Sequence, residues 1–322
     1  MKLRRLLPTL ITVAALSLGL SACSDGSSGH KYTIGVTVIV AHPALEAAQK
    51  GFEDVLTEEG LDYGIIFENA QGEKSNAATI ATMFADNKKI DLMLAISTDS
   101  SLALANVEKS RPILFTAVTD PVQEGLVPSW QTAAPNMTGT SDLNPGANTI
   151  ALMKEAMPNL KNVGVLYTSS ESNSLSQVDV YRTEAAVLGV TLQLQGITNA
   201  SEVSVGLAAL KDVEAIIVPT DNTVVAAIES VIAFGKENKI PIFCADSSTV
   251  ELGTVATRGL SYYELGRVTG EMAVGILRDG KTVADYPPQA PTGTDLSVNV
   301  TSAEAYGLTL PEEFVALAQT KF

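Results

Sequence analysis

The feature that most constrains the fold is a regular alternation of short apolar runs and amphipathic stretches, which starts at Tyr32. Residues 33–40 form a β-branched, nearly continuous apolar run, as expected for a strand buried on both faces of a parallel sheet. A helix is predicted at residues 43–59, with Pro43 in its first turn and Gly60 just past its end. Repeated strand–helix units of this kind predict a doubly wound α/β domain.

The pattern restarts after a polar, Gly-containing stretch at residues 136–142, and Val163-Gly164-Val165 echoes Ile34-Gly35-Val36. The sequence therefore predicts two similar α/β lobes in tandem. The other predicted strands are residues 65–68, 91–96, 112–117, 191–195, 215–218, 241–243, 255–258 and 296–300. The other predicted helices are residues 75–87, 147–157, 174–188, 201–210, 223–236 and 262–277, with a short one after residue 96 and another from residue 302.

The N-terminus has the features of an export signal. Lys2, Arg4 and Arg5 precede an apolar segment at residues 6–20, and small residues lead to a cysteine in Leu20-Ser21-Ala22-Cys23. This tetrapeptide resembles the bacterial lipobox, in which the cysteine is lipidated and becomes the mature N-terminus. The alternative is a signal-anchor helix with an incidental cysteine. We expect residues 1–22 to be a signal peptide, residues 23–31 a flexible tether, and the protein to be extracytoplasmic and lipid-anchored to the bacterial cell membrane.

The composition excludes several classes of function. The formal net charge is −15 and Lys and Arg are not clustered, so nucleic-acid binding is not expected. With two Cys and two His in the chain, no zinc site is expected. Neither a Gly-x-Ser-x-Gly elbow, nor a Gly-x-Gly-x-x-Gly loop after the first strand, nor a Walker A motif is present. We expect no enzymatic activity, cofactor or metal.

Polar residues follow the ends of most predicted strands, where ligands of open α/β sheets bind. Each of them has an ordinary alternative role, because Ser, Thr, Asp and Asn are the preferred N-caps of helices. Helix N-termini suit a carboxylate, and Asp120, Asp221 or Asp246 would suit an ammonium group. A zwitterionic amino acid meets both conditions, and a sugar would also use Asp and Asn. The ligand-binding candidates are His42, Ser97, Thr98, Thr119, Asp120, Tyr167, Ser169, Ser170, Asn173, Ser174, Asp221, Asn222 and Asp246.

Several longer motifs make a family resemblance specific. They are His42-Pro43-Ala44-Leu45, Asn69-Ala70-Gln71-Gly72, Phe115-Thr116-Ala117-Val118-Thr119-Asp120-Pro121, Thr138-Gly139-Thr140-Ser141-Asp142, Val165-Leu166-Tyr167 with Ser169-Ser170 and Asn173-Ser174, Pro219-Thr220-Asp221-Asn222-Thr223 and Tyr262-Tyr263-Glu264-Leu265-Gly266. From about Tyr32 to the C-terminus the chain resembles the ABC-transporter substrate-binding lipoproteins of the tryptophan/tyrosine-binding type.

The resemblance implies a type I periplasmic-binding fold, with two doubly wound Rossmann-like lobes joined by a three-strand hinge. The expected crossings lie near Thr140, Arg258 and Asp285. Lobe 1 would then comprise residues 32–139 and 259–284, and lobe 2 residues 140–258 and 285–322. The resemblance also implies an aromatic amino acid ligand, Trp or Tyr, and an ABC permease with its ATPase as partners.

On this basis we expect an amino acid in the cleft between the lobes. Its carboxylate would be held by Ser169, Ser170, Asn173 and Ser174, and its ammonium group by Asp120, Asp221 or Asp246, while Tyr167 and Tyr262 are candidates to stack on a ring. The alternatives are a ligand-sensing co-receptor and a binding protein for another small solute, such as a sugar or a nucleoside.

Overall fold

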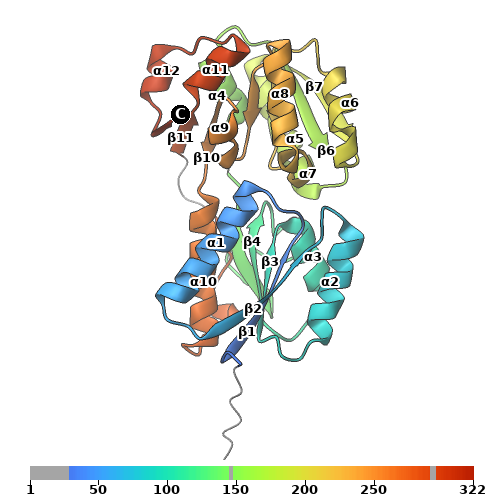
Figure 1. The fold of residues 1–322 in the computed structure, drawn as a ribbon, viewed down its shortest axis with the longest axis vertical. Coiled ribbons are helices and arrows are strands. Elements are labelled where there is room, and N and C mark those ends of the chain that lie inside the picture. The colour runs from blue at the N-terminus through green and yellow to red at the C-terminus, as the bar shows by residue number, and fades with distance from the viewer. Residues whose placement is uncertain (1–28, 145–147, 291–294) are drawn as a thin grey trace, which may run out of the picture.

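The computed structural model describes residues 29–144, 148–290 and 295–322, and they form two α/β lobes, one above the other in Figure 1. The predicted signal peptide, Cys23 and most of the predicted tether lie outside the described residues. Each lobe has a parallel sheet and its own apolar core, so the predicted fold class is confirmed. Within the described ranges, no helix has the length and apolar character needed to cross a bilayer.

Lobe 1 is built on a parallel five-stranded sheet in the order β2-β1-β3-β4-β5. Its strands β1, β3, β4 and β5 are almost fully buried, which explains their continuous apolar or small-residue sequences. The elements are β1 (Tyr32–Val38), α1 (Pro43–Glu58), β2 (Tyr63–Asn69), α2 (Lys74–Asp86), β3 (Leu92–Ile96), α3 (Thr98–Val107), β4 (Ile113–Val118) and β5 (Met137–Ser141).

Lobe 2 repeats the design with a parallel four-stranded sheet in the order β7-β6-β8-β9. The elements are α4 (Thr149–Ala156), β6 (Asn162–Thr168), α5 (Ser172–Leu188), β7 (Thr191–Ile197), η1 (Ala200–Glu202), α6 (Val203–Ala209), β8 (Ala215–Val218), α7 (Asn222–Ala226), α8 (Ile228–Asn238), β9 (Ile242–Cys244) and α9 (Ser248–Leu252).

The C-terminal part of the chain belongs to both lobes. The strand β10 (Ala256–Gly259) lies in lobe 2, and α10 (Tyr262–Leu277) then returns to lobe 1, where it packs beside α1 (Figure 1). This packing is close: a Cβ atom at Gly266 would lie 1.9 Å from the carbonyl oxygen of Ala48. After η2 (Val283–Asp285) the chain re-enters lobe 2 with β11 (Asp295–Val298), α11 (Val300–Tyr306), α12 (Glu312–Ala316) and β12 (Thr320–Lys321).

The chain therefore crosses between the lobes three times, between β5 and α4, between β10 and α10, and between η2 and β11. The first and third crossings touch, because Thr140 and Gln289 form a parallel bridge. The exact boundaries of the two lobes stay a prediction.

Two local predictions were wrong. Residues 223–236 are not one helix, because Ala227 (φ −107°, ψ 18°) separates α7 from α8. The apolar pattern continues through this break, so periodicity did not reveal it. Residues 137–141, predicted as a polar connection, form β5, a buried strand that pairs with β4. Its Gly139 is needed there, because a Cβ atom would lie 1.9 Å from the carbonyl oxygen of Phe115.

Candidate functional site

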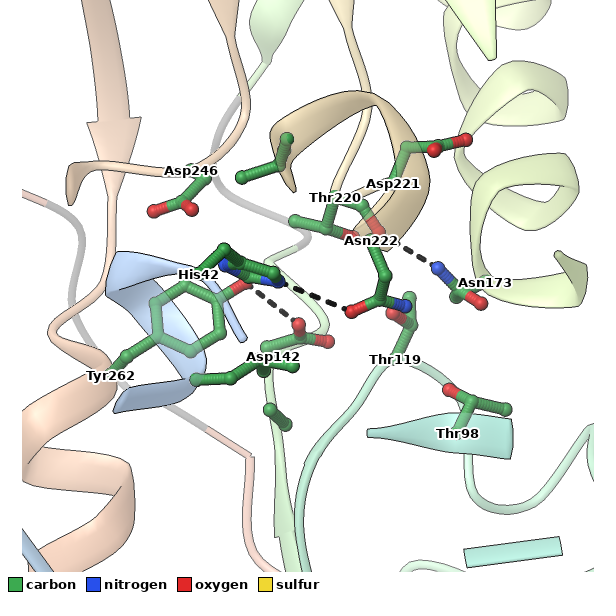
Figure 2. Close-up of a pocket in the computed structure, with 13 residues that line it drawn as sticks. His42, Thr98, Thr119, Asp142, Asn173, Thr220, Asp221, Asn222, Asp246 and Tyr262 are labelled. Atoms are coloured by element: carbon green, nitrogen blue, oxygen red, sulfur yellow. Dashed lines mark hydrogen bonds between the residues drawn. The ribbon is translucent and has the colours of Figure 1, made fainter. Parts of the chain in front are cut away.

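The parallel sheets of the two lobes share the order of their first four strands, and this order decides where a ligand can bind. In each lobe the direction in which successive strands are added to the sheet reverses at a switch point, between β1 and β3 in lobe 1 and between β6 and β8 in lobe 2. His42 and Thr98 follow the lobe 1 pair, and Asn173 and Thr220 follow the lobe 2 pair. All four line one cavity between the lobes, which we call the central cavity (Figure 2).

The lobes are closed on the central cavity. His42 Nε2 in lobe 1 lies 3.4 Å from Asn222 Oδ1 in lobe 2. Further out, Lys74 Nζ of lobe 1 donates to the carbonyl oxygen of Ser170 in lobe 2 over 2.7 Å and to Asp99 Oδ1 in its own lobe over 2.8 Å. The free space in the central cavity is about 10 Å³, room for about one water molecule.

The walls of the central cavity carry unused hydrogen-bonding atoms. Within the described part of the chain, His42 Nδ1, Asp142 Oδ1, Asn173 Oδ1 and Asp246 Oδ2 are buried and have no hydrogen-bond partner. Three of the four are oxygen acceptors, and two belong to carboxylates. An unpaired buried polar group is costly, so this arrangement favours a ligand that brings several N–H donors and a positive charge.

The other oxygen of each of these two carboxylates is hydrogen-bonded within the protein, and these bonds fix the orientation of the carboxylates. Asp142 Oδ2 accepts the phenol hydroxyl of Tyr262 over 2.8 Å. Asp246 Oδ1 accepts the backbone N–H and the hydroxyl of Ser248, each over 2.9 Å. In both residues one oxygen is held by the protein and the other is left for a ligand.

Burial is the main cause of the pKa shifts of the titratable groups in the central cavity. It raises the pKa of Asp142 and the pKa of Asp246, against the opposing effects of Tyr262 and Thr119 on the first and of His42 and Ser248 on the second. Burial also lowers the pKa of His42, although Asp246 and the hydrogen bond to Asn222 oppose this. No Lys or Arg is among the described residues that line the central cavity. An entering cation would therefore be the missing counter-charge.

The neutral donors lie on the lobe 1 side. Thr98, in the cavity wall, is the first residue of α3, and the N-cap Ser97 makes no side-chain capping bond. The hydroxyls of Ser97 and Ser100 are buried without a partner among the described residues. Because the first N–H groups of a helix have no partner within it, this end of α3 has spare donors for an anionic group.

The structure brings together about half of the predicted site residues. Those that line the central cavity are His42, Thr98, Thr119, Asn173, Asp221, Asn222 and Asp246. Ser97 is buried at the start of α3. Asp120 lies in the wall of a neighbouring cavity, and its Oδ1 accepts the N–H groups of Val122 and Gln123, which fixes the turn that follows β4.

Asp221 differs from the ammonium ligand that was expected, because its hydrogen bonds lie within lobe 2. Its two oxygens accept from Thr168 N, Thr168 Oγ1, Ser174 Oγ and Val224 N. Burial, together with the nearby Glu171, raises the pKa of Asp221 to about 7. Asp221 thus joins the end of β6 to the starts of α5 and α7.

Four other predicted residues lie outside the central cavity. The hydroxyl of Ser174 is bound to Asp221, and that of Ser169 donates to the carbonyl oxygen of Ile197 over 3.0 Å. Ser170 is exposed and accepts from Lys74 through its carbonyl oxygen. Tyr167 is half-buried against the core of lobe 2. The strand-end pattern located the right loops but did not separate their inward-facing residues from their capping residues.

Sequence reasoning missed two polar residues of the central cavity, Asp142 and Thr220, which were named only as parts of the motifs that carry the family resemblance. It also missed the apolar lining residues Leu45, Ala117 and Val225. Behind the lining, Glu171 is buried and accepts from the side chains of Asn173, Asn222 and Thr223. Tyr262, proposed as a stacking residue, does line the cavity.

A second, larger cavity lies beside the central one and encloses about 390 Å³. The two share Asp142, Thr220 and Tyr262 in their walls, so they are adjacent. The described part of the chain contains no cluster of three or more His, Cys, Asp or Glu side chains that could hold a metal ion.

Comparisons with known proteins agree with this geometry. The model of the family described as ABC transporter substrate binding protein matches residues 33–321. A tyrosine-binding protein from Clostridioides difficile is 36% identical over 315 residues, which cover 92% of this chain and 91% of that protein. The structure of an ABC domain in complex with L-Trp from Streptococcus pneumoniae is 32% identical with a TM-score of 0.86, over 90% of this chain and 99% of that one.

A third relative helps to interpret the lobe arrangement. The ligand-free, open structure of a substrate-binding protein with adhesive properties from Clostridium difficile is 39% identical, with the same coverage of 90% and 99%, but its TM-score is 0.66. It is closer in sequence than the L-Trp complex and yet further in overall shape. The lobes here are arranged more like those of the complex, in agreement with the cross-lobe hydrogen bonds. The chain belongs to the ABC transporter substrate-binding proteins, which are extracytoplasmic ligand binders without enzymatic activity.

Proposed function

We propose that this protein captures an aromatic amino acid, Tyr or Trp, between its lobes and delivers it to an ABC permease driven by its ATPase. The observation that carries the proposal is the pair of half-used carboxylates, Asp142 and Asp246, which are buried in a cavity whose described lining residues include no Lys or Arg. An α-ammonium group has three N–H donors and a positive charge, and it would satisfy both carboxylates.

The carboxylate of the ligand would lie on the other side of the cavity, at the start of α3. The sequence predicted Ser169, Ser170, Asn173 and Ser174 for this role. The hydroxyls of Ser169 and Ser174 bond elsewhere, and Ser170 is exposed. The side-chain N–H donors of Asn173 bond to Glu171 and to the carbonyl oxygen of Thr220. The N–H groups of the first turn of α3 and the hydroxyls of Thr98 and Thr119 are neutral donors. They suit an anion in a site whose described lining includes no Lys or Arg.

The names of the relatives support the aromatic class. One relative is a tyrosine-binding protein, and another was solved with L-Trp. Both align with at least 90% of this chain, so the comparison includes both lobes and the cleft between them.

Calorimetric titration of the purified protein, freed of carried-over ligand, against the twenty amino acids tests the proposal. We expect micromolar or tighter binding that is confined to Tyr, Trp and Phe. Binding of a sugar or a nucleoside, with no response to any amino acid, would keep the family and overturn the zwitterion argument.

We further propose that a lipid on Cys23 anchors the protein outside the cytoplasmic membrane, with residues 24–31 as a tether. Cells that express a Cys23→Ser variant should release the protein to the soluble fraction, whereas wild type should remain with the membrane. Uptake of labelled Tyr by cells that lack the gene distinguishes import from sensing: import predicts slower uptake, and a sensing co-receptor predicts an unchanged rate.

A further inference from the structure

The second cavity is large enough to hold a ligand, whereas the central cavity is not. Its volume of about 390 Å³ is within the range of about 300–1,000 Å³ that is typical of ligand pockets, while the central cavity holds about one water. The two cavities adjoin at Asp142, Thr220 and Tyr262. A ligand with its charged end at Asp142 would therefore place its bulk in the second cavity.

Helix α5 forms one wall of the second cavity. Gln177, Tyr181 and Glu184 follow one another at helical spacing and line it. Gln177 marks the end next to the central cavity, because its Nε2 donates to Thr220 Oγ1 over 2.6 Å. Glu184 lies seven residues further along the helix, a distance of about 10 Å. The cavity is thus elongated, with Glu184 towards the far end.

The walls between these two ends suit a flat apolar group. Leu143 and Leu260 come from the crossings between the lobes, and Val180 and Tyr181 come from α5. Tyr262 provides a ring that both cavities share. Aromatic and aliphatic side chains around one space favour an aromatic ring over a polar chain.

Glu184 is half-buried in the wall of the second cavity, which also includes the polar residues Asn144 and Thr149. The backbone N–H of Ile150 donates to its Oε2 over 2.8 Å and holds the carboxyl in place. A carboxylate offers about four acceptor positions, so Glu184 has capacity for a further donor. Burial raises the pKa of Glu184, against the opposing effect of hydrogen bonds from the backbone N–H groups of Ile150 and Thr149.

We propose that the second cavity receives the side chain of the ligand and that Glu184 accepts a hydrogen bond from a donor at the end of that side chain. The protein then selects rings that carry an O–H or N–H group, as in Tyr and Trp, over the plain ring of Phe. This inference rests on the proposed function, in which the ammonium group of the amino acid lies at Asp142 and Asp246. A site built to bond a donor disfavours the analogue without it, because its polar group is then left unpaired.

The test is calorimetric titration of the full chain with Tyr, Trp and Phe, for wild type and two variants. Glu184→Gln keeps an acceptor for Ile150 N and removes the charge. We expect wild type to prefer Tyr over Phe by about tenfold or more, and Glu184→Gln to reduce that ratio at least about fivefold with little change for Phe. Val180→Trp, at a half-exposed position, should fill the cavity and weaken all three ligands by more than about tenfold.

Two variants on the same helix are the controls. Val187→Trp places the same ring at a position that is 82% exposed and outside the cavity, and Asp179→Asn removes an exposed charge; both should bind as wild type does. If Tyr binds but Glu184→Gln leaves the Tyr-to-Phe ratio unchanged, or Val180→Trp binds normally, the inference is overturned and the proposed function stands. If wild type binds none of the three amino acids, both are overturned.

Discussion

Tyr262 donates its phenol hydroxyl to Oδ2 of Asp142 over 2.8 Å and leaves Oδ1 of that carboxylate free inside the central cavity. Both residues stand at crossings between the lobes: Asp142 follows β5, and Tyr262 is the first residue of α10. A group that binds Asp142 therefore contacts the connection between the lobes directly. We therefore expect closure of the lobes and capture of a cation to be coupled through this pair.

Tyr262→Phe should weaken amino acid binding by about tenfold. The change removes the bond that orients Asp142 and leaves a buried carboxylate with one partner fewer, at a cost of about 1–3 kcal/mol. Calorimetry measures the effect. The matched control is Tyr263→Phe, because the hydroxyl of Tyr263 donates to the distant Asp54 and the residue does not line the central cavity. Equal losses in the two variants would contradict the role given to Tyr262.

Asp246→Asn should weaken binding by at least about 2 kcal/mol, roughly thirtyfold, because it removes one charge of a buried ion pair with the ligand. Asn keeps an oxygen for Ser248, so the local turn should persist. Unchanged affinity for Tyr and Trp would remove Asp246 from the site.

The same variant tests the pKa shift in the empty protein. Burial raises the pKa of Asp246 above its ordinary value of 3.8, so the folded state holds this proton more tightly than the unfolded chain does. The stability that this residue contributes is complete below about pH 3.8 and is lost as the pH rises through its folded pKa. Relative to wild type, the melting temperature of ligand-free Asp246→Asn should rise as the pH increases above 4. A constant difference would contradict this account.

Asp221→Ala should act on stability more than on the ligand. The change leaves four donors at the junction of β6, α5 and α7 without their acceptor, and we expect a loss of about 3 kcal/mol of unfolding free energy. Chemical denaturation measures this loss. At a temperature where the variant is folded, its affinity for Tyr should fall by less than tenfold. A large loss of affinity with normal stability would restore Asp221 as a ligand for the ammonium group.

Lys74→Met should make ligand release faster. Its ammonium group joins the two lobes by donating to Ser170 O, and about half of the side chain is exposed, so the expected loss is about 1 kcal/mol, or roughly fivefold in the dissociation rate. Stopped-flow fluorescence measures that rate. Lys88→Met is the control, because the ammonium group of Lys88 donates within lobe 1, to the carbonyl oxygen of Ala85. An unchanged dissociation rate in Lys74→Met would show that this bond does not hold the closed state.

Much of the fold followed from the sequence because the main sheet of each lobe is parallel and its inner strands are buried. Runs such as Leu92–Ile96 are apolar at every position, and the same signal recurs in each strand–helix unit. The prediction failed where the local sequence pattern differs from the role of the segment in the folded protein. Met137–Ser141 reads as a polar loop but is a buried strand, because Thr138 and Thr140 bond to Tyr286 O and to Thr116.

The site was predicted less completely, for a physical reason. Strand-end position indicates which loops meet in the cleft, and it found His42, Thr98 and Asp246. A shift of one residue decides whether a side chain in such a loop faces the cavity or caps a helix. The spacing of polar residues in the sequence does not reveal that shift. Asp221 and Asp246 look alike in the sequence, but the first is used within lobe 2 and the second keeps a free oxygen.

The central claim is that Asp142 and Asp246 bind the ammonium group of an amino acid in the central cavity. The most direct measurement is a calorimetric comparison of L-Tyr with its analogue that lacks only the amino group, 3-(4-hydroxyphenyl)propionate. The account predicts that L-Tyr binds and that the analogue binds at least about a hundredfold more weakly, because the two carboxylates are left buried and unpaired. Equal binding of the two compounds would contradict it.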